Sequence, residues 1–235
     1  MTEALWRYAL VAAALSAWGV LIVALWRRRL RRLRAAHRAD WGRAWINELD
    51  GLNRWFCRRY HRLRHNRLDL PARGPAIVAA NHVSGLDSLL LVAASRRPLR
   101  FIIAREQYRR AWLTWLFRAI GCIPVDRSTN PRRALAAARA ALARGVVVAL
   151  FPQGRIHLDH EPPARLKAGV HYLAQATGAP IFPVRIDGVR GAGRVVSAVL
   201  RRSRARLRCH PPIDAAGRPA DAVLAELGER LRGRR

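Results

Sequence analysis

The chain has 235 residues, of which 44 are basic and 15 are acidic, so its formal net charge is +29 at neutral pH. This length suits one well-buried domain with an appendage and excludes two full-sized domains, while such a positive surface is expected to seek nucleic acid, acidic lipid headgroups or phosphorylated substrates. The three cysteines are odd in number and stand at no ligand-like spacing with histidine, so we expect neither a disulfide framework nor a metal site, which fits a reducing compartment.

The first 26 residues contain an uncharged apolar run at 8–26. As a helix, this run is long enough to cross the ~30 Å hydrocarbon layer of a bilayer, and Trp6 and Trp26 stand where interface aromatics would. Arginines follow directly at 27–29, which predicts that the rest of the chain is cytoplasmic. We therefore expect a single-pass transmembrane helix in a bacterial inner membrane. A cleaved signal peptide is the alternative, but the apolar run is long for one.

Residues 27–68 form a basic arm, with 14 arginines against 3 acidic residues between 27 and 67. Six apolar residues recur in it at helical spacing: Trp41, Trp45, Leu49, Leu52, Phe56 and Leu63. Either this helix lies in the headgroup layer with its arginines toward anionic lipids, or its apolar stripe packs on the domain that follows. Both interpretations place the arm close to a bilayer.

Residues 69–235 alternate short β-rich runs with helical ones, which predicts an α/β fold with a mixed, largely parallel sheet flanked by helices. The predicted strands are 76–80, 99–104, 122–126, 146–151, 181–186 and 205–210. The predicted helices are 86–94, 106–120, 131–143, 166–177 and 219–232. Chemistry in such sheets lies beyond the carboxyl ends of the strands, where polar clusters stand here at 81–87, 126–127 and 152–155.

The first of these clusters contains His82 and Asp87. Histidine is the natural general base near neutral pH, and a carboxylate on its second ring nitrogen fixes the tautomer and stabilises the imidazolium. Residues five apart on a straight helix point ~140° from each other, but Ser84 and Gly85 permit a turn that folds His82 back over the next helix. The alternative is that Asn81 and Ser84 merely cap that helix.

The other two clusters carry arginines that suit phosphate. Arg127 and Arg155 each offer a planar guanidinium, and Gly154 would let an anion approach the backbone closely. The alternative for each arginine is a solvated surface charge, which is common in an arginine-rich chain.

Four blocks of the sequence, "NHVSGLD", "GCIPVDR", "FPQGRI" and "APIFPV", occur in that order between residues 71 and 188. In order and spacing they resemble the 1-acyl-glycerol-3-phosphate acyltransferase family, a family of membrane-associated α/β enzymes. The resemblance covers about half of the chain.

This resemblance implies transfer of a fatty acyl group from acyl-CoA or acyl carrier protein to the free hydroxyl of a lysophospholipid, with neither a cofactor nor a metal. His82 would be the general base and Asp87 would orient it. The residues implied to bind substrate, with the acceptor phosphate held by Arg127 and its neighbours, are Asn81, Ser84, Arg127, Gln153, Gly154, Arg155 and Lys167.

The third block departs from the family pattern. Gln153 stands where the family usually has Glu, and Ile156 stands where it often has Arg, so the acceptor can be another lysolipid in place of 1-acyl-glycerol-3-phosphate. A protein that only binds anionic lipid or nucleic acid is the remaining alternative. We expect no nucleic-acid partner, because the chain has no recognisable nucleic-acid motif and its positive charge is spread.

Overall fold

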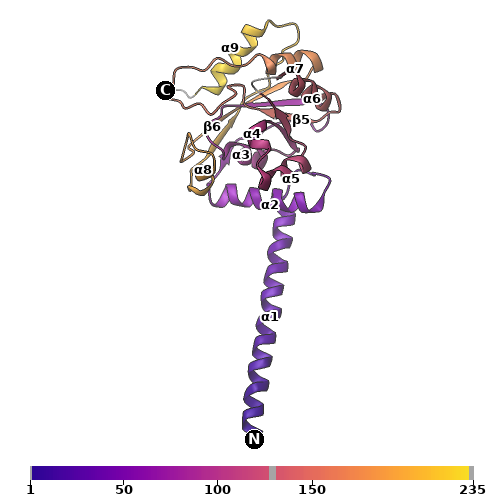
Figure 1. Ribbon diagram of the computed structural model, residues 1–235, viewed down its shortest axis with the longest axis vertical. Coiled ribbons are helices and arrows are strands. Elements are labelled where there is room, and N and C mark those ends of the chain that lie inside the picture. Colours follow the sequence, from indigo (N-terminus) through magenta and orange to yellow (C-terminus); the bar gives the residue numbers. More distant parts are fainter. Residues whose placement is uncertain (1, 127–130, 233–235) are drawn as a thin grey trace.

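The structure is a computed structural model that describes residues 2–126 and 131–232. In Figure 1, helix 44–59 lies across the lower end of an α/β domain, and the long N-terminal helix extends away from that end. The helices are α1 (Thr2–Ala36), α2 (Ala44–Arg59), α3 (Asp87–Ala94), α4 (Arg105–Tyr108), α5 (Ala111–Ala119), α6 (Pro131–Ala143), α7 (Gly169–Thr177), α8 (Val196–Leu200) and α9 (Ala220–Leu231).

The described strands form one sheet in the order β1-β7-β6-β2-β5-β3-β4. They are β1 (Arg64–His65), β2 (Ala76–Ala80), β3 (Leu99–Ala104), β4 (Ile123–Val125), β5 (Val147–Leu150), β6 (Ile181–Asp187) and β7 (Arg206–Cys209). Among these strands, neighbours run parallel except for β6 and β7. The predicted mixed, largely parallel sheet is therefore confirmed, and so are all six predicted strands to within two residues at each end.

Four elements differ from the prediction. Helix α7, expected from residue 166, begins at Gly169. The helix expected at 106–120 is interrupted, because Arg110 adopts an extended backbone (φ −61°, ψ 113°) between α4 and α5. The two-residue strand β1 and the short helix α8 were not predicted, since neither is long enough to show a periodic pattern.

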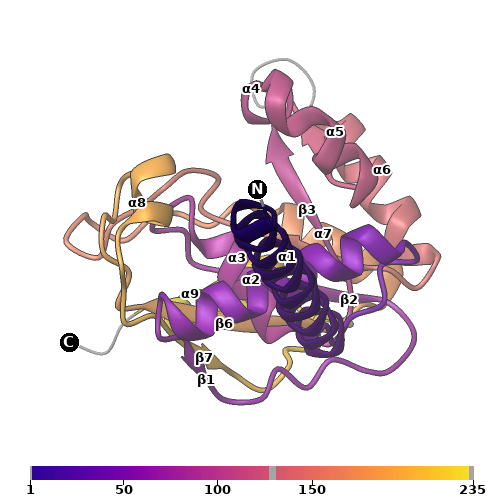
Figure 2. The same ribbon diagram turned by 90° about the horizontal axis from the view of Figure 1, so that it is seen from below.

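Successive residues of the central strands point to opposite faces of the sheet, and each face has its own core. Val78 and Ala80 pack on the side that holds α2 and α3. Ile77 and Ala79 pack on the side that holds α6, α7 and α9. Figure 1 shows α6, α7 and α9 above the sheet and α2 below it, and Figure 2 looks from below, with α1 and α2 in front of the strands. This burial on both faces leaves the strand ends as the place where polar side chains gather.

Helix α1 continues without a break past residue 26, the predicted end of the apolar segment, into the arginine-rich segment. Residues 27–36 of the basic arm therefore belong to the same helix as the apolar run. Among the described residues, we find no helix that has the length and apolar character needed to cross a membrane. The transmembrane helix expected at 8–26 is therefore not found. The side chains of residues 8–12, at the start of that expected span, lie outside the described part of the chain.

Helix α2 packs on the domain through a polar contact. The buried Arg54 pairs with Asp50 (Nε to Oδ2, 2.6 Å) and donates to the carbonyl oxygens of Ala93 and Ser95 at the end of α3. This arginine of the basic arm thus ties α2 to α3 and does not face outward.

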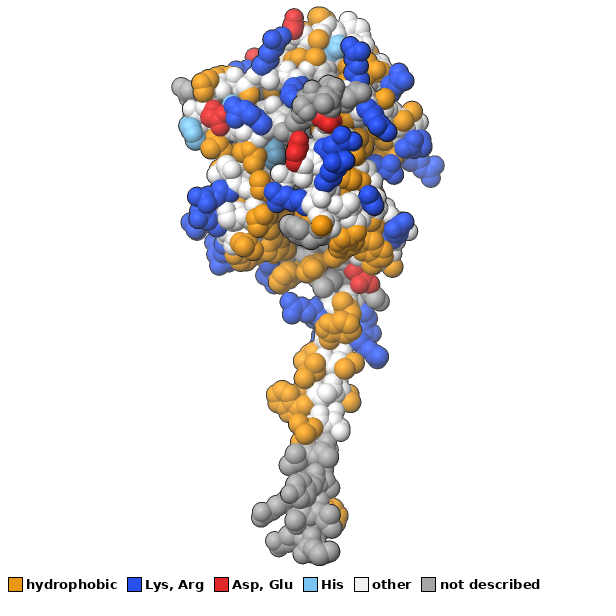
Figure 3. Space-filling model, viewed as in Figure 1, with side chains coloured by type: hydrophobic (Ala, Val, Ile, Leu, Met, Phe, Trp, Pro, Cys, Tyr) orange, Lys and Arg blue, Asp and Glu red, His pale blue; other side chains and the backbone are white. Residues whose placement is uncertain are grey.

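The predicted apolar stripe of the arm is divided. Trp45, Leu49 and Leu52 are exposed, whereas Trp41 and Phe56 are partly buried and Leu63 is buried. Trp55 of α2, which was not part of the predicted stripe, is exposed as well. Trp115 of α5 adjoins this surface, with its ring centroid 5.6 Å from that of Trp45. We call Trp45, Leu49, Leu52, Trp55 and Trp115 the apolar face. Figure 3 shows hydrophobic side chains gathered over the end of the domain from which α1 leaves. Packing of the stripe on the domain, one of the two interpretations of the arm, is therefore confirmed only for Phe56 and Leu63.

Candidate active site

His82 and Asp87 meet at the carboxyl end of β2. The Nδ1 atom of His82 lies 2.8 Å from Oδ2 of Asp87, so the predicted pair is in contact. The turn between them fits tightly against residues 191–195, because a Cβ on Gly85 would collide with the carbonyl oxygen of Val195. A glycine is therefore needed where the chain turns back toward α3.

Asp87 is fully buried and accepts hydrogen bonds at both carboxylate oxygens. Besides the His82 ring, its donors are the backbone N–H of Val83 (2.6 Å), the backbone N–H of Ser84 (2.8 Å) and the Ser84 hydroxyl (2.8 Å). A buried carboxylate needs such donors to offset its lost hydration. These bonds hold the carboxylate in one orientation behind the imidazole.

The loop that follows β5 holds His82 on three sides. The ring of Phe151 stacks on the imidazole at a centroid distance of 4.1 Å. The side-chain oxygen of Gln153 accepts the backbone N–H of His82 at 2.8 Å, and the backbone N–H of His157 donates to the His82 carbonyl at 2.8 Å. The His82 side chain remains 20% exposed. With Nδ1 directed at Asp87, Nε2 is the ring nitrogen left to meet a substrate.

Two of the predicted substrate-binding residues are buried supports. The Asn81 amide exchanges two hydrogen bonds with the backbone of Ile186 in β6, at 2.6 and 3.0 Å. The hydroxyl of Ser84 donates to Asp87 and accepts the backbone N–H of Leu86. Their polar atoms are thus engaged within the protein, where they fix the end of β2 and the following turn.

Gly154 and Lys167 lie against each other. Gly154 has a φ of +75°, and a Cβ there would stand 2.5 Å from Cε and 2.8 Å from Nζ of Lys167. The lysine side chain therefore crosses the glycine directly after Gln153, and the absence of a Cβ allows this approach. This arrangement places an ammonium group next to the loop that holds His82.

Of the two arginines that were expected to bind phosphate, the structure describes only Arg155. Arg155 pairs with Glu161 (Nη2 to Oε2, 2.7 Å) on the surface of the same loop. A backbone hydrogen bond from Leu158 and this arginine lower the pKa of the Glu161 carboxyl. Arg127 lies outside the described residues.

Sequence reasoning missed Phe151, His157 and Arg185. Phe151 lies within a quoted block but was not singled out, and nothing local marks His157. Arg185 is buried in β6, pairs with Asp159 and Asp187, and donates to the carbonyl of Leu231 at the end of α9. It thereby ties the loop after β5 to the sheet and to the C-terminal helix.

The thiols of Cys57 and Cys122 are also buried, and this burial raises the pKa of each to about 12. At neutral pH both are protonated and poor nucleophiles. Within the described part of the chain, no group of three or more His, Cys, Asp or Glu side chains is arranged to hold a metal ion.

Comparisons with known proteins place the chain in a family. The sequence model of the family described as Acyltransferase matches residues 61–187. The chain is 24% identical over 174 residues to "1-acyl-sn-glycerol-3-phosphate acyltransferase" of Bacillus subtilis (strain 168), which covers 72% of this chain and 84% of that protein. It is 33% identical over 125 residues to "Probable 1-acyl-sn-glycerol-3-phosphate acyltransferase" of Mycoplasma genitalium, over 50% of this chain and 46% of that protein.

Among solved structures, the fold is similar to the crystal structure of the 1-acyl-sn-glycerophosphate (LPA) acyltransferase PlsC from Thermotoga maritima. The TM-score is 0.60 at 22% sequence identity, and the match covers 81% of this chain and 78% of that one. At this identity the likeness concerns the fold alone. Because the family match spans more than half of the 235 residues and includes the His82–Asp87 pair, the chain belongs to the Acyltransferase family and is an acyltransferase.

Proposed function

We propose that this enzyme transfers a fatty acyl group from a thioester, acyl-CoA or acyl carrier protein, to the free hydroxyl of a lysophospholipid, with 1-acyl-glycerol-3-phosphate as the preferred acceptor. The single observation that carries the proposal is the His82–Asp87 contact, with the second ring nitrogen of His82 left for substrate. The names of the relatives support the choice of acceptor.

In the proposed mechanism, Nε2 of His82 takes the proton of the acceptor hydroxyl as its oxygen attacks the thioester carbonyl. Asp87 keeps the hydrogen on Nδ1 and stabilises the imidazolium that forms. The tetrahedral intermediate collapses to the ester, the carbon–sulfur bond breaks, and the imidazolium returns its proton to the thiolate. Both substrates are present at once, so no acyl-enzyme forms.

Direct transfer is supported by the state of two buried cysteines and of the serine that lies beside Asp87. Burial raises the pKa of the Cys57 and Cys122 thiols to about 12, which keeps both protonated. The Ser84 hydroxyl is buried and already donates to Asp87. A serine nucleophile would instead need to donate its hydrogen to the general base.

For the acceptor phosphate we propose Arg127, Gly154, Arg155 and Lys167. The support is the approach of the Lys167 ammonium to Gly154 in the loop that holds His82. Arg155 would have to exchange Glu161 for the phosphate, which is feasible because its guanidinium is largely exposed.

We also propose that the enzyme collects its acceptor at a membrane surface rich in anionic lipids, on the cytoplasmic side of the bacterial inner membrane. Lysophospholipids reside in bilayers, and the apolar face offers five exposed large side chains next to the arginine-rich end of α1. Exposed apolar patches rimmed by cations suit such a surface. The three free cysteines agree with a reducing compartment.

The test is thiol release by the purified full chain in detergent, with acyl-CoA or acyl carrier protein as donor and a panel of lysolipids as acceptors. We expect the highest kcat/KM with 1-acyl-glycerol-3-phosphate and loss of release in His82→Ala. A preference for headgroups that lack a terminal phosphomonoester would favour the second candidate, the same chemistry on another lysolipid, which Gln153 and Ile156 motivate.

A further inference from the structure

The ring of Phe151 covers one face of the His82 imidazole. The two ring centroids are 4.1 Å apart and the ring planes differ by only 14°, so the rings stack face to face. Asp87 meets the same imidazole at its edge, where Oδ2 lies 2.8 Å from Nδ1. The base is therefore contacted from two directions, by a carboxylate at its edge and by an aromatic ring over its face.

The sheet brings Phe151 and His82 together. Strands β2 and β5 are parallel neighbours, and Ala79 pairs with Leu150 in their register. Phe151 follows β5 directly, and His82 is the second residue after β2. The two rings thus leave the sheet side by side, at the edge where the carboxyl ends of parallel strands meet.

The Phe151 ring is itself held in place. Phe101 of β3 is buried and stacks on Phe151, with a centroid distance of 6.3 Å and an angle of 23° between the ring planes. The carbonyl oxygen of Phe151 accepts the backbone N–H of Gly154 at 2.9 Å, which closes the turn after β5. Phe151 therefore keeps its position when the charge on His82 changes.

An aromatic face attracts a cation. The ring quadrupole makes the face negative, and a cation within about 6 Å of the ring centroid is stabilised by it. The imidazole is neutral before it takes a proton and positive afterwards, so the stack favours the state that the base reaches during the reaction. Burial opposes this attraction because it disfavours the charged form. The His82 side chain remains 20% exposed, so part of its hydration is kept.

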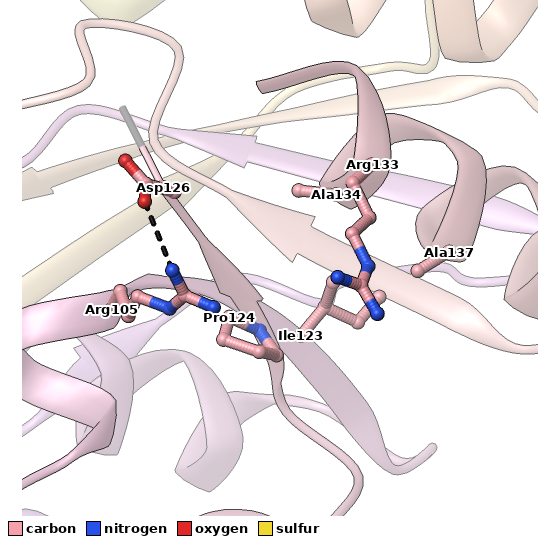
Figure 4. A pocket seen from close by; sticks show the side chains of 7 residues that line it. All are labelled: Arg105, Ile123, Pro124, Asp126, Arg133, Ala134 and Ala137. Atoms are coloured by element: carbon pink, nitrogen blue, oxygen red, sulfur yellow. Dashed lines mark hydrogen bonds and ion pairs between the residues drawn. The ribbon is translucent and has the colours of Figure 1, made fainter. Parts of the chain in front are cut away.

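Arginines at two cavities beside β4 offer a contrast. The cavities have volumes of about 440 and 410 Å³ and share Arg105. Figure 4 shows the first, with Arg105 directed at the Asp126 carboxylate, and Arg109 and Arg118 line the second. All three arginines are exposed, so water stabilises their charge. The imidazolium of His82 depends far more on its contacts within the protein.

We propose that Phe151 stabilises the imidazolium form of His82 through the face of its ring. This inference rests on the proposed function and adds a residue to its proton transfer. Phe151 acts through His82, so it is a positioning residue, and its role is separate from that of the Asp87 carboxylate at the ring edge.

The charges around His82 also affect its titration. The Asn81 amide bonds to Ile186, and the carbonyl of Arg194 accepts the backbone N–H of Gly85. The titratable or charged side chains that the packed elements bring to this turn are Asp87 from α3, His157 and Lys167 from the loop after β5, Asp187 from the end of β6, and Arg194. All of them stay unchanged in the experiment, so a shift in titration reports the Phe151 ring.

The experiment replaces Phe151 in the full chain by 4-fluoro-, 3,4,5-trifluoro- and pentafluorophenylalanine. Fluorine makes the ring face less negative in steps and changes its shape little. We expect kcat to fall in the order of fluorine content, by about 2- to 10-fold overall. The acidic limb of the kcat/KM profile should move to lower pH by about 0.3 to 1 unit, because the proton is held less tightly. A packing defect would lower kcat without moving this limb.

The control carries the same fluorinated residues at Phe101, which stacks on Phe151. No described contact joins Phe101 to the His82 ring, so the acidic limb should stay in place in this series. Thermal unfolding of every variant verifies that it is folded. An equal shift of the limb in both series would overturn the inference, because the cause would then be general packing.

NMR titration of the His82 ring without substrate separates this inference from the proposed function. The His82 signal is identified in histidine-labelled protein by its absence from His82→Gln. Its titration midpoint should move to lower pH with fluorination at Phe151. Such a shift without acyl transfer by wild type would refute the function and keep the role of the ring. A midpoint that stays fixed or rises across the series would overturn the inference, since burial would then outweigh the attraction.

Discussion

Two histidines of this molecule, His82 and His61, differ in whether a carboxylate contacts the ring. In His82, Nδ1 is held by the Asp87 carboxylate and the side chain stays partly exposed beyond β2. In His61, at the end of α2, Nε2 lies 3.1 Å from the carbonyl of Val199 and therefore donates, while Nδ1 is buried without a hydrogen-bond partner among the described residues. Only the first arrangement can accept a proton and stabilise the charge that results.

The surroundings of His61 oppose that charge. Its ring packs edge-on against Phe56 and Tyr60, with centroid distances of 4.7 and 5.0 Å. Burial lowers the pKa of His61, and the hydrogen bond to the Val199 carbonyl offsets only part of this effect. Protonation would leave a second N–H buried and unpaired. His61 is thus a neutral packing residue. His82 can carry a positive charge because the Asp87 carboxylate contacts its ring, and His61 has no such contact among the described residues.

The largest expected effect comes from removing the base. His82→Ala should lower kcat by about 10²- to 10⁴-fold, because proton transfer by a positioned base contributes that much. The measurement is thiol release, together with thermal unfolding to show that the variant folds. His61→Gln is the matched control and should keep kcat within a fewfold. Near-wild-type turnover by folded His82→Ala would refute the proposed mechanism.

The next effect concerns the carboxylate. Asp87→Asn removes the charge behind His82 and places an amide among four donors, so we expect kcat to fall by about 10- to 10³-fold. The free energy of unfolding should also fall by about 1–3 kcal/mol, because buried donors lose an acceptor. Urea unfolding and steady-state kinetics measure the two quantities. An unchanged kcat with lowered stability would make Asp87 a purely structural residue.

A smaller effect is expected at Gln153, which holds the backbone of His82. Gln153→Ala leaves that N–H without its acceptor and should lower kcat by about 5- to 50-fold. Gln153→Glu keeps the acceptor and adds a negative charge, which favours the protonated form of a nearby base. The acidic limb of its kcat/KM profile should therefore move to higher pH. If Gln153→Ala and Gln153→Glu move the acidic limb of the kcat/KM profile equally, the negative charge of Glu is not the cause of the shift.

The smallest effect is the contribution of His61 to acid stability. The lowered pKa means that the folded state binds fewer protons than the unfolded state just below pH 6.5, so stability falls as the pH drops through this range. The change cannot exceed about 1.4 kcal/mol per pH unit for one proton. Urea unfolding between pH 5 and 7.5 should show a shallower slope in His61→Gln. An equal slope in both proteins would contradict this role.

Local patterns in the sequence determined much of this architecture. The strands at 76–80 and 99–104 and the helix at 131–143 were predicted with their observed bounds, because side-chain period and turn residues act over a few neighbours. The His82–Asp87 contact was predicted for the same reason, since one Ser-Gly turn suffices to bring residues five apart together.

Contacts between distant segments were beyond such reasoning. Gln153 binds the backbone of His82, which lies 71 positions earlier in the sequence. Arg54 binds the carbonyl oxygens of Ala93 and Ser95, which lie 39 and 41 positions later. The four blocks in the sequence pointed to an acyltransferase, but the structure assigned Asn81 and Ser84 to supporting bonds and left the predicted transmembrane helix unfound.

The sequence by itself therefore determined six of the described strands, most helices, the base with its carboxylate and the family resemblance. Only the tertiary structure decided that α2 buries Arg54 and exposes its tryptophans, that the loop after β5 holds His82, and that Arg105, Arg109 and Arg118 line one cavity. The physical reason is that burial and charge pairing depend on which elements pack together, and this choice is made by the whole chain.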